Sequence, residues 1–405
     1  MCQLDTLGKC RNRLTLRKAL TSLPSTLDET YDRILCAISK EDSEYAVRIL
    51  RWLAFSARPL LVEEIAEVIA IDVERNPAFN REEVLEDPLD VLSICSSLVT
   101  ITTTRSTWNR LQTGPDVPSR CVALAHYSVK EYLISERSAQ SVASRYTMED
   151  IACNEFLAKS CISYLLQFQV PDSISQENIH KAKLASYAAE FWISHAQVGS
   201  HNAEDLNCLI MELFSTGNSA YLNWVQIYNP DQPWYQLNLK NPSAEVPAPL
   251  YYASSSGLTT IVELLLGKGA DMNAQGGGYG NALQAASSRG HDKIIELLLG
   301  KGADVNAQGG HFGNALQAAS YEGDGRIVKL LLDKGADVNA QGGHYGSALQ
   351  AASVEGHDKI IELLLGKGAD VNAQGGHYGS ALQAASVRGH DKTVELLLGK
   401  GADLY

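Results

Sequence analysis

Hydrophobic and polar positions recur with a fixed period of 33 residues through the C-terminal part of the chain. The clearest marker is the triplet Gly-Ala-Asp, which ends at Asp271, Asp304, Asp337, Asp370 and Asp403. A period of this length is typical of a solenoid, whose stacked units bury the apolar faces that one unit alone leaves exposed. The pattern predicts about five repeats over residues 246–405.

Each repeat predicts two short helices. In the unit that starts at Ser347, this serine is an N-cap candidate for a helix of small residues over 348–353. Gly356 is expected to end that helix and Gly368 to end a second one over 358–365, since a helix stop favours φ > 0. The apolar stripe of the second helix consists of Ile360, Ile361, Leu364 and Leu365.

The first 140 residues follow a different pattern. Amphipathic stretches predict helices over 12–38 (broken at Leu23-Pro24-Ser25), 45–56, 61–70 and 128–135, and β-branched alternation predicts strands over 98–103 and 121–126. Three helices followed by a hairpin with a long loop, here 105–119, is the order of a winged helix. Residues 141–245 read as a helical connector in which Trp192, Trp224 and Trp234 pack. The predicted fold class is therefore mainly α: a winged-helix-like domain with a small β-hairpin, a helical connector and a repeat solenoid.

Composition supports a boundary between the connector and the repeats. Of 32 glycines, 28 lie from residue 246 onward, and none of the 12 prolines follows Pro249. The segment 241–247 is the plainest linker, which divides the chain into domains over 1–140, 141–245 and 246–405.

Charge and cysteine usage narrow the classes of partner. The net charge of -13 is poorly suited to nonspecific binding of a phosphate backbone, so we expect neither nucleic acid nor anionic membrane as a partner. The predicted helix over 61–70 carries Glu63, Glu64 and Glu67 and no basic residue, which argues against a DNA-reading role. No Cys-x-x-Cys pair, signal peptide or long apolar stretch is present, so we expect free thiols and a cytoplasmic location.

The repeat resembles the ankyrin repeat. The family pattern Thr-Pro-Leu-His-x-Ala-Ala corresponds to residues 347–353, Ser-Ala-Leu-Gln-Ala-Ala-Ser, and is followed by Gly356-His357. This unit departs from the pattern by Ser for Thr, Ala for Pro and Gln for His. The resemblance implies a non-enzymatic function in which a protein ligand docks on the concave face of the solenoid.

A second resemblance covers the N-terminal part. Residues 23–35, 52–65, 126–133 and 187–196 are similar to the segment that follows the NACHT nucleotide-binding domain in fungal NOD-like receptors. That family places a P-loop ATPase directly upstream, but no Gly-x-x-x-x-Gly-Lys-Ser/Thr occurs in this sequence. The resemblance implies the sensor part of an immunity or incompatibility receptor, with the ATPase domain or chain as a possible partner. The alternative is a free-standing ankyrin adaptor or scaffold, and an in-frame P-loop in the upstream genomic sequence would favour the receptor.

Histidines are the candidate catalytic or metal-binding groups. His311, His344 and His377 recur one per repeat, each before an aromatic residue. Equivalent atoms of stacked helical units lie roughly 8–10 Å apart, too far to share one zinc ion, so we expect exposed hairpin-tip residues.

The remaining histidines also favour structural roles. His291, His357 and His390 are expected to start second helices and to bond backbone, and the equivalent residue of the middle unit is Asp324. His126 has Ser128 and Glu131 near it in sequence, which does not establish a catalytic triad, so we interpret it as a turn or packing residue. We therefore expect no enzymatic activity, no cofactor and no metal.

The few positions that differ among the repeats suggest where the partner binds. One position reads Ser288, Tyr321, Val354 and Val387, and its neighbour reads Arg289, Glu322, Glu355 and Arg388. The hypothesis is that these residues form the contact surface together with His311, His344 and His377; neutral drift on a solvated surface is the alternative. Under this hypothesis Tyr321→Ala weakens binding and leaves the melting curve almost unchanged, because a tyrosine is a frequent binding anchor.

Overall fold

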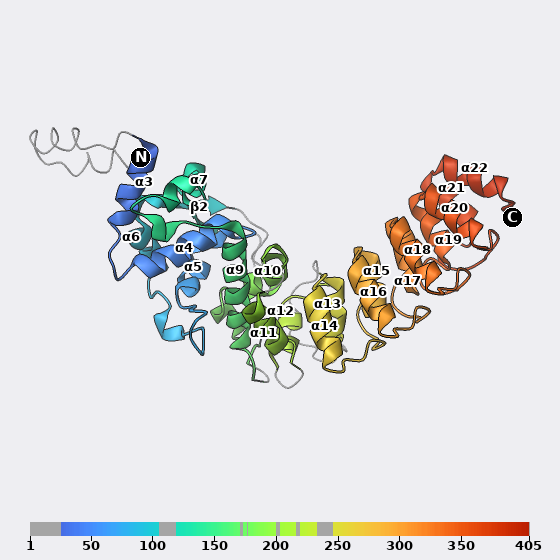
Figure 1. Ribbon diagram of the computed structural model, residues 1–405, viewed down its shortest axis with the longest axis horizontal. Coiled ribbons are helices and arrows are strands. Elements are labelled where there is room, and N and C mark those ends of the chain that lie inside the picture. Colours follow the sequence, from blue (N-terminus) through green and yellow to red (C-terminus); the bar gives the residue numbers. More distant parts are fainter. Residues whose placement is uncertain are drawn as a thin grey trace, which may run out of the picture. The chain divides into compact units, whose positions relative to one another are not determined.

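The computed structural model describes residues 26–104, 119–170, 173–175, 177–199, 203–215, 219–232 and 246–404. By its internal contacts the chain forms two compact units (Figure 1). Unit 1 comprises Met1–Asn229 with Pro233–Pro242, and unit 2 comprises Pro230–Gln232 with Ser243–Tyr405. The part of the predicted helix before residue 26, the loop 105–118 and Trp234 lie outside the described residues.

The first part of unit 1 combines short helices with a small antiparallel sheet. The helices are α3 (Leu27–Cys36), α4 (Ser43–Phe55), α5 (Val62–Ile69), α6 (Val91–Cys95), α7 (Tyr127–Leu133) and α8 (Glu136–Ala139). The strands are β1 (Leu60–Leu61), β2 (Val99–Thr104) and β3 (Ser119–Leu124), in the sheet order β1-β3-β2. The predicted hairpin is the β2–β3 pair, in which Ile101 lies opposite Val122. The mainly α fold with a small hairpin is therefore confirmed, and β1 adds a third strand that the sequence did not predict.

Helix α5 is the most buried of these elements. Seven of its eight residues are buried, Glu64 and Glu67 among them. Arg58 binds the Glu64 carboxylate with both guanidinium nitrogens, at 2.6 and 2.8 Å, while Glu67 accepts a 2.6 Å bond from the Tyr164 hydroxyl. Burial raises the pKa of Glu67. Both carboxylates are therefore held inside unit 1, whereas the absence of a basic residue from this helix, on which the argument against DNA reading rests, is unchanged.

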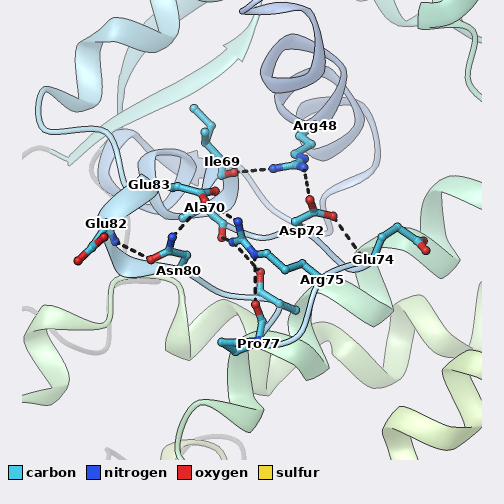
Figure 2. A network of polar contacts seen from close by, with 11 residues as sticks. Arg48, Ile69, Ala70, Asp72, Glu74, Arg75, Pro77, Asn80, Glu82 and Glu83 are labelled. Atoms are coloured by element: carbon cyan, nitrogen blue, oxygen red, sulfur yellow. Dashed lines mark hydrogen bonds and ion pairs between the residues drawn. The ribbon is translucent and has the colours of Figure 1, made fainter.

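Two arginines hold the segment that follows α5 (Figure 2). Arg48 pairs with Asp72 at 3.3 Å. Arg75 pairs with Glu83, whose carboxylate also accepts a 3.1 Å bond from the Asn80 amide. Each pair is partly exposed and contributes little alone, but together they close the turn that carries the chain from α5 into the short 3-10 helix η1 (Arg81–Glu83).

The second part of unit 1 is helical, as predicted. Its helices are α9 (Asp150–Leu166), α10 (Ala185–Val198), α11 (Glu204–Leu213) and α12 (Ala220–Ile227); short 3-10 turns in unit 1 span Arg81–Glu83, Pro88–Asp90, Ser96–Leu98, Ser144–Tyr146 and Ile179–Lys181. Trp192 and Trp224 are fully buried with ring centroids 5.5 Å apart, and the Trp224 indole donates to the Ala189 carbonyl at 2.9 Å. The predicted packing role of these two tryptophans is confirmed.

A buried contact joins the winged-helix-like part to the helices that follow it. The ring of Tyr187 on α10 lies 5.3 Å from that of Trp52 on α4, and its hydroxyl accepts a 2.8 Å bond from the Ala57 amide. The same hydroxyl meets the Nε2 atom of His195 at 2.9 Å. Residues before and after position 140 therefore share one core. The predicted domain boundary between residues 140 and 141 stays a prediction.

Unit 2 consists of helix pairs stacked in sequence order. The first helices are α13 (Pro249–Ser255), α15 (Ala282–Arg289), α17 (Ala315–Glu322), α19 (Ala348–Glu355) and α21 (Ala381–Arg388). The second helices are α14 (Thr259–Gly267), α16 (Asp292–Gly300), α18 (Gly325–Asp333), α20 (Asp358–Gly366) and α22 (Asp391–Gly399).

The predicted helix ends of the Ser347 unit are confirmed. The Ser347 hydroxyl accepts a hydrogen bond from the backbone N–H of Gln350 at 3.2 Å. Gly356 and Gly368 end the two helices with φ of 71° and 90°, in the left-handed region that glycine adopts most readily.

Candidate functional site

Four tight hairpins, here called fingers, connect consecutive repeats. They comprise residues 275–280, 308–313, 341–346 and 374–379, and each is closed by a bridge between two glycines. The fingers pair through their backbones, because the His344 amide donates to the His311 carbonyl at 2.8 Å and the His377 amide donates to the His344 carbonyl at 2.8 Å. A Cβ atom on Gly310 would lie 2.1 Å from the Tyr279 carbonyl carbon, so this approach requires glycine.

A buried glutamine in each interior repeat fixes the next finger. The side-chain nitrogen Nε2 of Gln350 donates to the Gly379 carbonyl at 2.8 Å and to the Gly375 carbonyl at 3.0 Å. Gln284 and Gln317 bond the fingers that follow them in the same way. Glutamine at this position therefore adds a buried side-chain donor to the carbonyl groups of the finger. The Gly379 carbonyl also accepts from the Gly375 backbone N–H at 2.8 Å.

The first finger is held by different residues. Tyr251 stands where later repeats have glutamine, and its hydroxyl lies 2.9 Å from the Asp231 carboxylate and accepts from the Tyr279 amide at 3.1 Å. Asp231 also accepts from the Gly278 amide at 2.8 Å. Residues just before the first repeat thus complete the finger ladder at that end.

The histidines at the start of the second helices have the predicted structural role. The Nε2 atom of His357 lies 2.9 Å from the Tyr321 carbonyl, and that of His390 lies 2.9 Å from the Val354 carbonyl. The Nε2 atom of His291 lies 3.2 Å from the Ser255 carbonyl in the equivalent contact. Asp324, which occupies this position in the repeat between His291 and His357, instead caps its helix by accepting from the Arg326 backbone amide at 3.0 Å.

Aromatic residues of successive fingers form a column. The rings of Tyr279 and Phe312 stack with centroids 6.0 Å apart, and those of Phe312 and Tyr345 with centroids 5.8 Å apart. Tyr321, at the end of α17, packs on Tyr345 at 4.7 Å. Tyr279 and Tyr321 are only partly buried, so they border both this cluster and the exposed surface.

The exposed imidazoles of His311, His344 and His377 form a second column. Neighbouring ring centroids are 4.9 Å apart with interplanar angles of 18°. The expected spacing of 8–10 Å between these groups is therefore wrong: the fingers pair through backbone hydrogen bonds, and their spacing is that of β-strands instead of packed helices. Partial burial and the neighbouring histidines lower the pKa of His344.

The other predicted contact residues divide by exposure. Arg289, Glu322, Val387 and Arg388 are exposed, and Tyr321 and Glu355 are half-buried. Ser288 and Val354 are buried, so their assignment to the contact surface is wrong. The Ser288 hydroxyl donates to Glu322 at 3.1 Å, and Val354 belongs to the cluster that contains Tyr345 and Ala384.

Residues of both charges lie along the exposed part of this surface. The Arg289 guanidinium lies 5.5 Å from the centroid of the Tyr279 ring, and Arg388 binds Glu355 at 3.0 Å. Glu322 follows Arg289 by one repeat. The fingers and the exposed C-terminal ends of the first helices, called the finger face below, therefore offer aromatic edges and both signs of charge, which is the chemistry of a protein-binding surface.

His126 caps a helix in unit 1. Its Nδ1 atom accepts from the Ser128 amide at 3.2 Å and lies 2.6 Å from the Ser128 hydroxyl. The turn role predicted for His126 is confirmed by this cap. Within the described ranges, no set of three or more His, Cys, Asp or Glu side chains is placed to hold a metal ion.

Comparison with known families agrees with this geometry. Four overlapping segments, 217–309, 250–342, 285–375 and 315–405, match the family described as "Ankyrin repeats (3 copies)". Unit 2 is an ankyrin-repeat solenoid. Residues 31–148 match the family described as "GPI inositol-deacylase, winged helix domain", so a winged-helix domain precedes the ankyrin repeats. Ankyrin repeats generally mediate protein–protein interactions.

A curated relative matches much of the chain. It is "Azaphilone pigments biosynthesis cluster protein L" of Monascus ruber, which is 37% identical over 286 residues. The match includes 68% of this chain and 59% of the relative, so the chain spans less than two thirds of that protein's length. In the part of the chain that the structure describes, we find no helix with the length and apolar character that crossing a bilayer requires.

Proposed function

We propose that this chain is a non-enzymatic recognition protein whose ankyrin repeats bind a protein partner on the finger face. The observation that supports this is the contrast between framework and surface. The glutamine and glycine contacts that build the fingers repeat from unit to unit, while the exposed residues Arg289, Glu322 and Arg388 change the charge of one repeat position. A constant scaffold that carries a variable exposed row is well suited to recognition of a particular partner.

We further propose that the chain is the sensor part of a NOD-like receptor that acts in the cytoplasm. The succession of a winged-helix domain and ankyrin repeats supports this proposal, since it matches the order expected after a NACHT ATPase. The missing ATPase domain or chain would then be a partner of unit 1. An in-frame P-loop directly upstream in the gene would support this proposal, and a promoter or an unrelated gene at that place would remove it.

A second candidate is a free-standing adaptor or scaffold. The name of the Monascus ruber relative, a pigment biosynthesis cluster protein, favours this alternative. In this case the finger face would hold an enzyme or a regulator of a biosynthetic gene cluster. The two candidates share the binding surface and differ in the partner.

Charge reversal tests the shared part of the proposal. The double variant Arg289→Glu with Arg388→Glu reverses two charges on the finger face. Its control, Lys293→Glu with Lys359→Glu, reverses two exposed charges on the second helices α16 and α20. A partner that copurifies with the wild-type chain and the Lys293/Lys359 variant, but is lost from the Arg289/Arg388 variant, supports the finger face. Equal loss from both variants, or from neither, contradicts it.

A further inference from the structure

The histidine column places three imidazoles on one exposed line. Backbone bonds of 2.8 Å join His311 to His344 and His344 to His377, so the Cα atoms of these residues are held at strand-like spacing. The ring centroids are 4.9 Å apart in both pairs, and the interplanar angle is 18° in both. The first finger carries Gly278 at this position, so the column contains three histidines.

The three fingers that carry the column contain no Asp, Glu, Lys or Arg. The finger that carries His344 reads Gln-Gly-Gly-His-Tyr-Gly over 341–346, without an acid or a base. Each imidazole stands edge-on to the aromatic residue that follows it, with ring centroids 5.4 Å apart at Phe312, 4.9 Å at Tyr345 and 5.1 Å at Tyr378. These contacts leave the ring nitrogen atoms open, and within the described residues none of them takes part in a hydrogen bond.

We propose that neighbouring histidines of this column bind one late first-row divalent cation, Cu²⁺ or Zn²⁺. Neutral imidazole is a preferred ligand of both ions. An ion with nitrogen ligands at ~2.0–2.1 Å can join two imidazoles whose nitrogens approach to within about 4 Å. Rings that already stack at 4.9 Å reach this separation by rotation about exposed side-chain torsions.

The site has two protein ligands and open coordination positions. Because no set of three or more ligating side chains is present in the described residues, water completes the coordination of the ion. His344 belongs to both possible pairs, with His311 or with His377. Because both pairs need His344, the column holds one ion at a time, bound by either pair. The bound ion joins two consecutive repeats. This inference does not depend on the proposed protein partner.

Titration of the purified full chain with Zn²⁺ and with Cu²⁺ tests the inference. We expect one saturable site, a higher melting temperature in its presence, and no such effect of Mg²⁺, which prefers oxygen ligands. His344→Ala removes both pairs and should lower the affinity by about tenfold or more, because the second imidazole acts as an intramolecular ligand. His311→Ala or His377→Ala leaves one pair and should lower it only about twofold, and the double variant should match His344→Ala.

The exposed His180 in unit 1 provides the control. His180→Ala should leave the affinity unchanged. If His344→Ala does not fold, His344→Gln repeats the central test with a polar side chain. Three results would mean an adventitious ion only and would overturn the inference. The first is wild-type affinity in folded His344→Ala or His344→Gln, and the second is the absence of a saturable site. The third is an equal loss of affinity in the single alanine variants of His180, His311, His344 and His377.

Discussion

Tyr321 packs its ring on that of Tyr345, with centroids 4.7 Å apart and an interplanar angle of 27°. Tyr321 ends the first helix of one repeat, and Tyr345 lies in the finger that leads to the next. The residue singled out as an exposed binding anchor is therefore also part of the packing that holds a finger. Binding and stability cannot be separated at this position by truncation to alanine.

Tyr321→Ala should lower the free energy of unfolding by about 2 kcal/mol, because a half-buried aromatic side chain and its stack with Tyr345 are lost. This replaces the sequence-based expectation of an unchanged melting curve. Tyr321→Phe keeps the ring and should cost less than about 1 kcal/mol. Urea denaturation of both variants checks this prediction, and an unchanged midpoint for Tyr321→Ala would show that the stack contributes nothing.

Gln350→Ala should destabilise unit 2 by about 1–3 kcal/mol, because the buried hydrogen bonds that its side-chain amide donates to the next finger are lost. Gln383 provides a matched control at the same repeat position. It is exposed and lies in the last repeat of the sequence, where its side chain accepts from the Ser380 amide at 3.1 Å. Gln383→Ala should therefore cost less than about 1 kcal/mol, as measured by denaturant unfolding. Equal costs for the two variants would refute the role assigned to Gln350.

His195 should make the stability of unit 1 depend on pH. Its Nδ1 atom lies 2.9 Å from the side-chain oxygen Oδ1 of Asn154, so Nδ1 carries the hydrogen, and Nε2 accepts from the Tyr187 hydroxyl. Burial lowers the pKa of His195 from 6.5 to about 4. The contribution of neutral His195 to the free energy of unfolding is thus complete above pH 6.5 and declines as the pH falls through about 4. The reason is that the unfolded chain takes up a proton that the folded chain does not bind.

The amount lost over this range is about 3 kcal/mol, from ~1.4 kcal/mol per pKa unit. His195→Gln removes this titration. The difference in unfolding free energy between wild type and variant should therefore shrink as pH falls from about 7 to about 4.5. A difference that stays constant over this range would show that His195 is not held neutral by the fold.

The chain should neither bind nor hydrolyse ATP or GTP. The sequence contains no Gly-x-x-x-x-Gly-Lys-Ser/Thr segment that could surround a nucleotide's phosphates. Equilibrium titration with a fluorescent ATP analogue and a phosphate-release assay check this prediction. Saturable micromolar binding would contradict it.

The sequence predicted the features that depend on neighbouring residues. Ser347, Gly356 and Gly368 have the cap geometry that short-range rules assign to them, and the period placed every helix pair of unit 2. Strand β2 was visible as β-branched alternation, and β3 was predicted as its partner across the loop. Strand β1, with two residues, is too short to produce a pattern.

Features that depend on distant residues could not be predicted in this way. Glu67 is buried because Tyr164 provides a donor 97 positions later. Val354 and Val387 are the same residue at the same repeat position, yet they are 2% and 73% exposed, because only the first is covered by a following repeat. The 4.9 Å spacing of His344 and His377 follows from backbone pairing between fingers, which helix-packing distances do not describe.

The central claim is that a protein partner binds the finger face of the ankyrin repeats. Hydrogen exchange of the full chain, measured with and without a partner obtained by copurification, tests it most directly. We expect slower exchange on binding in the four fingers and at the ends of α15, α17, α19 and α21, with unchanged exchange in the second helices α16, α18 and α20. Protection confined to those second helices or to unit 1 would contradict the claim.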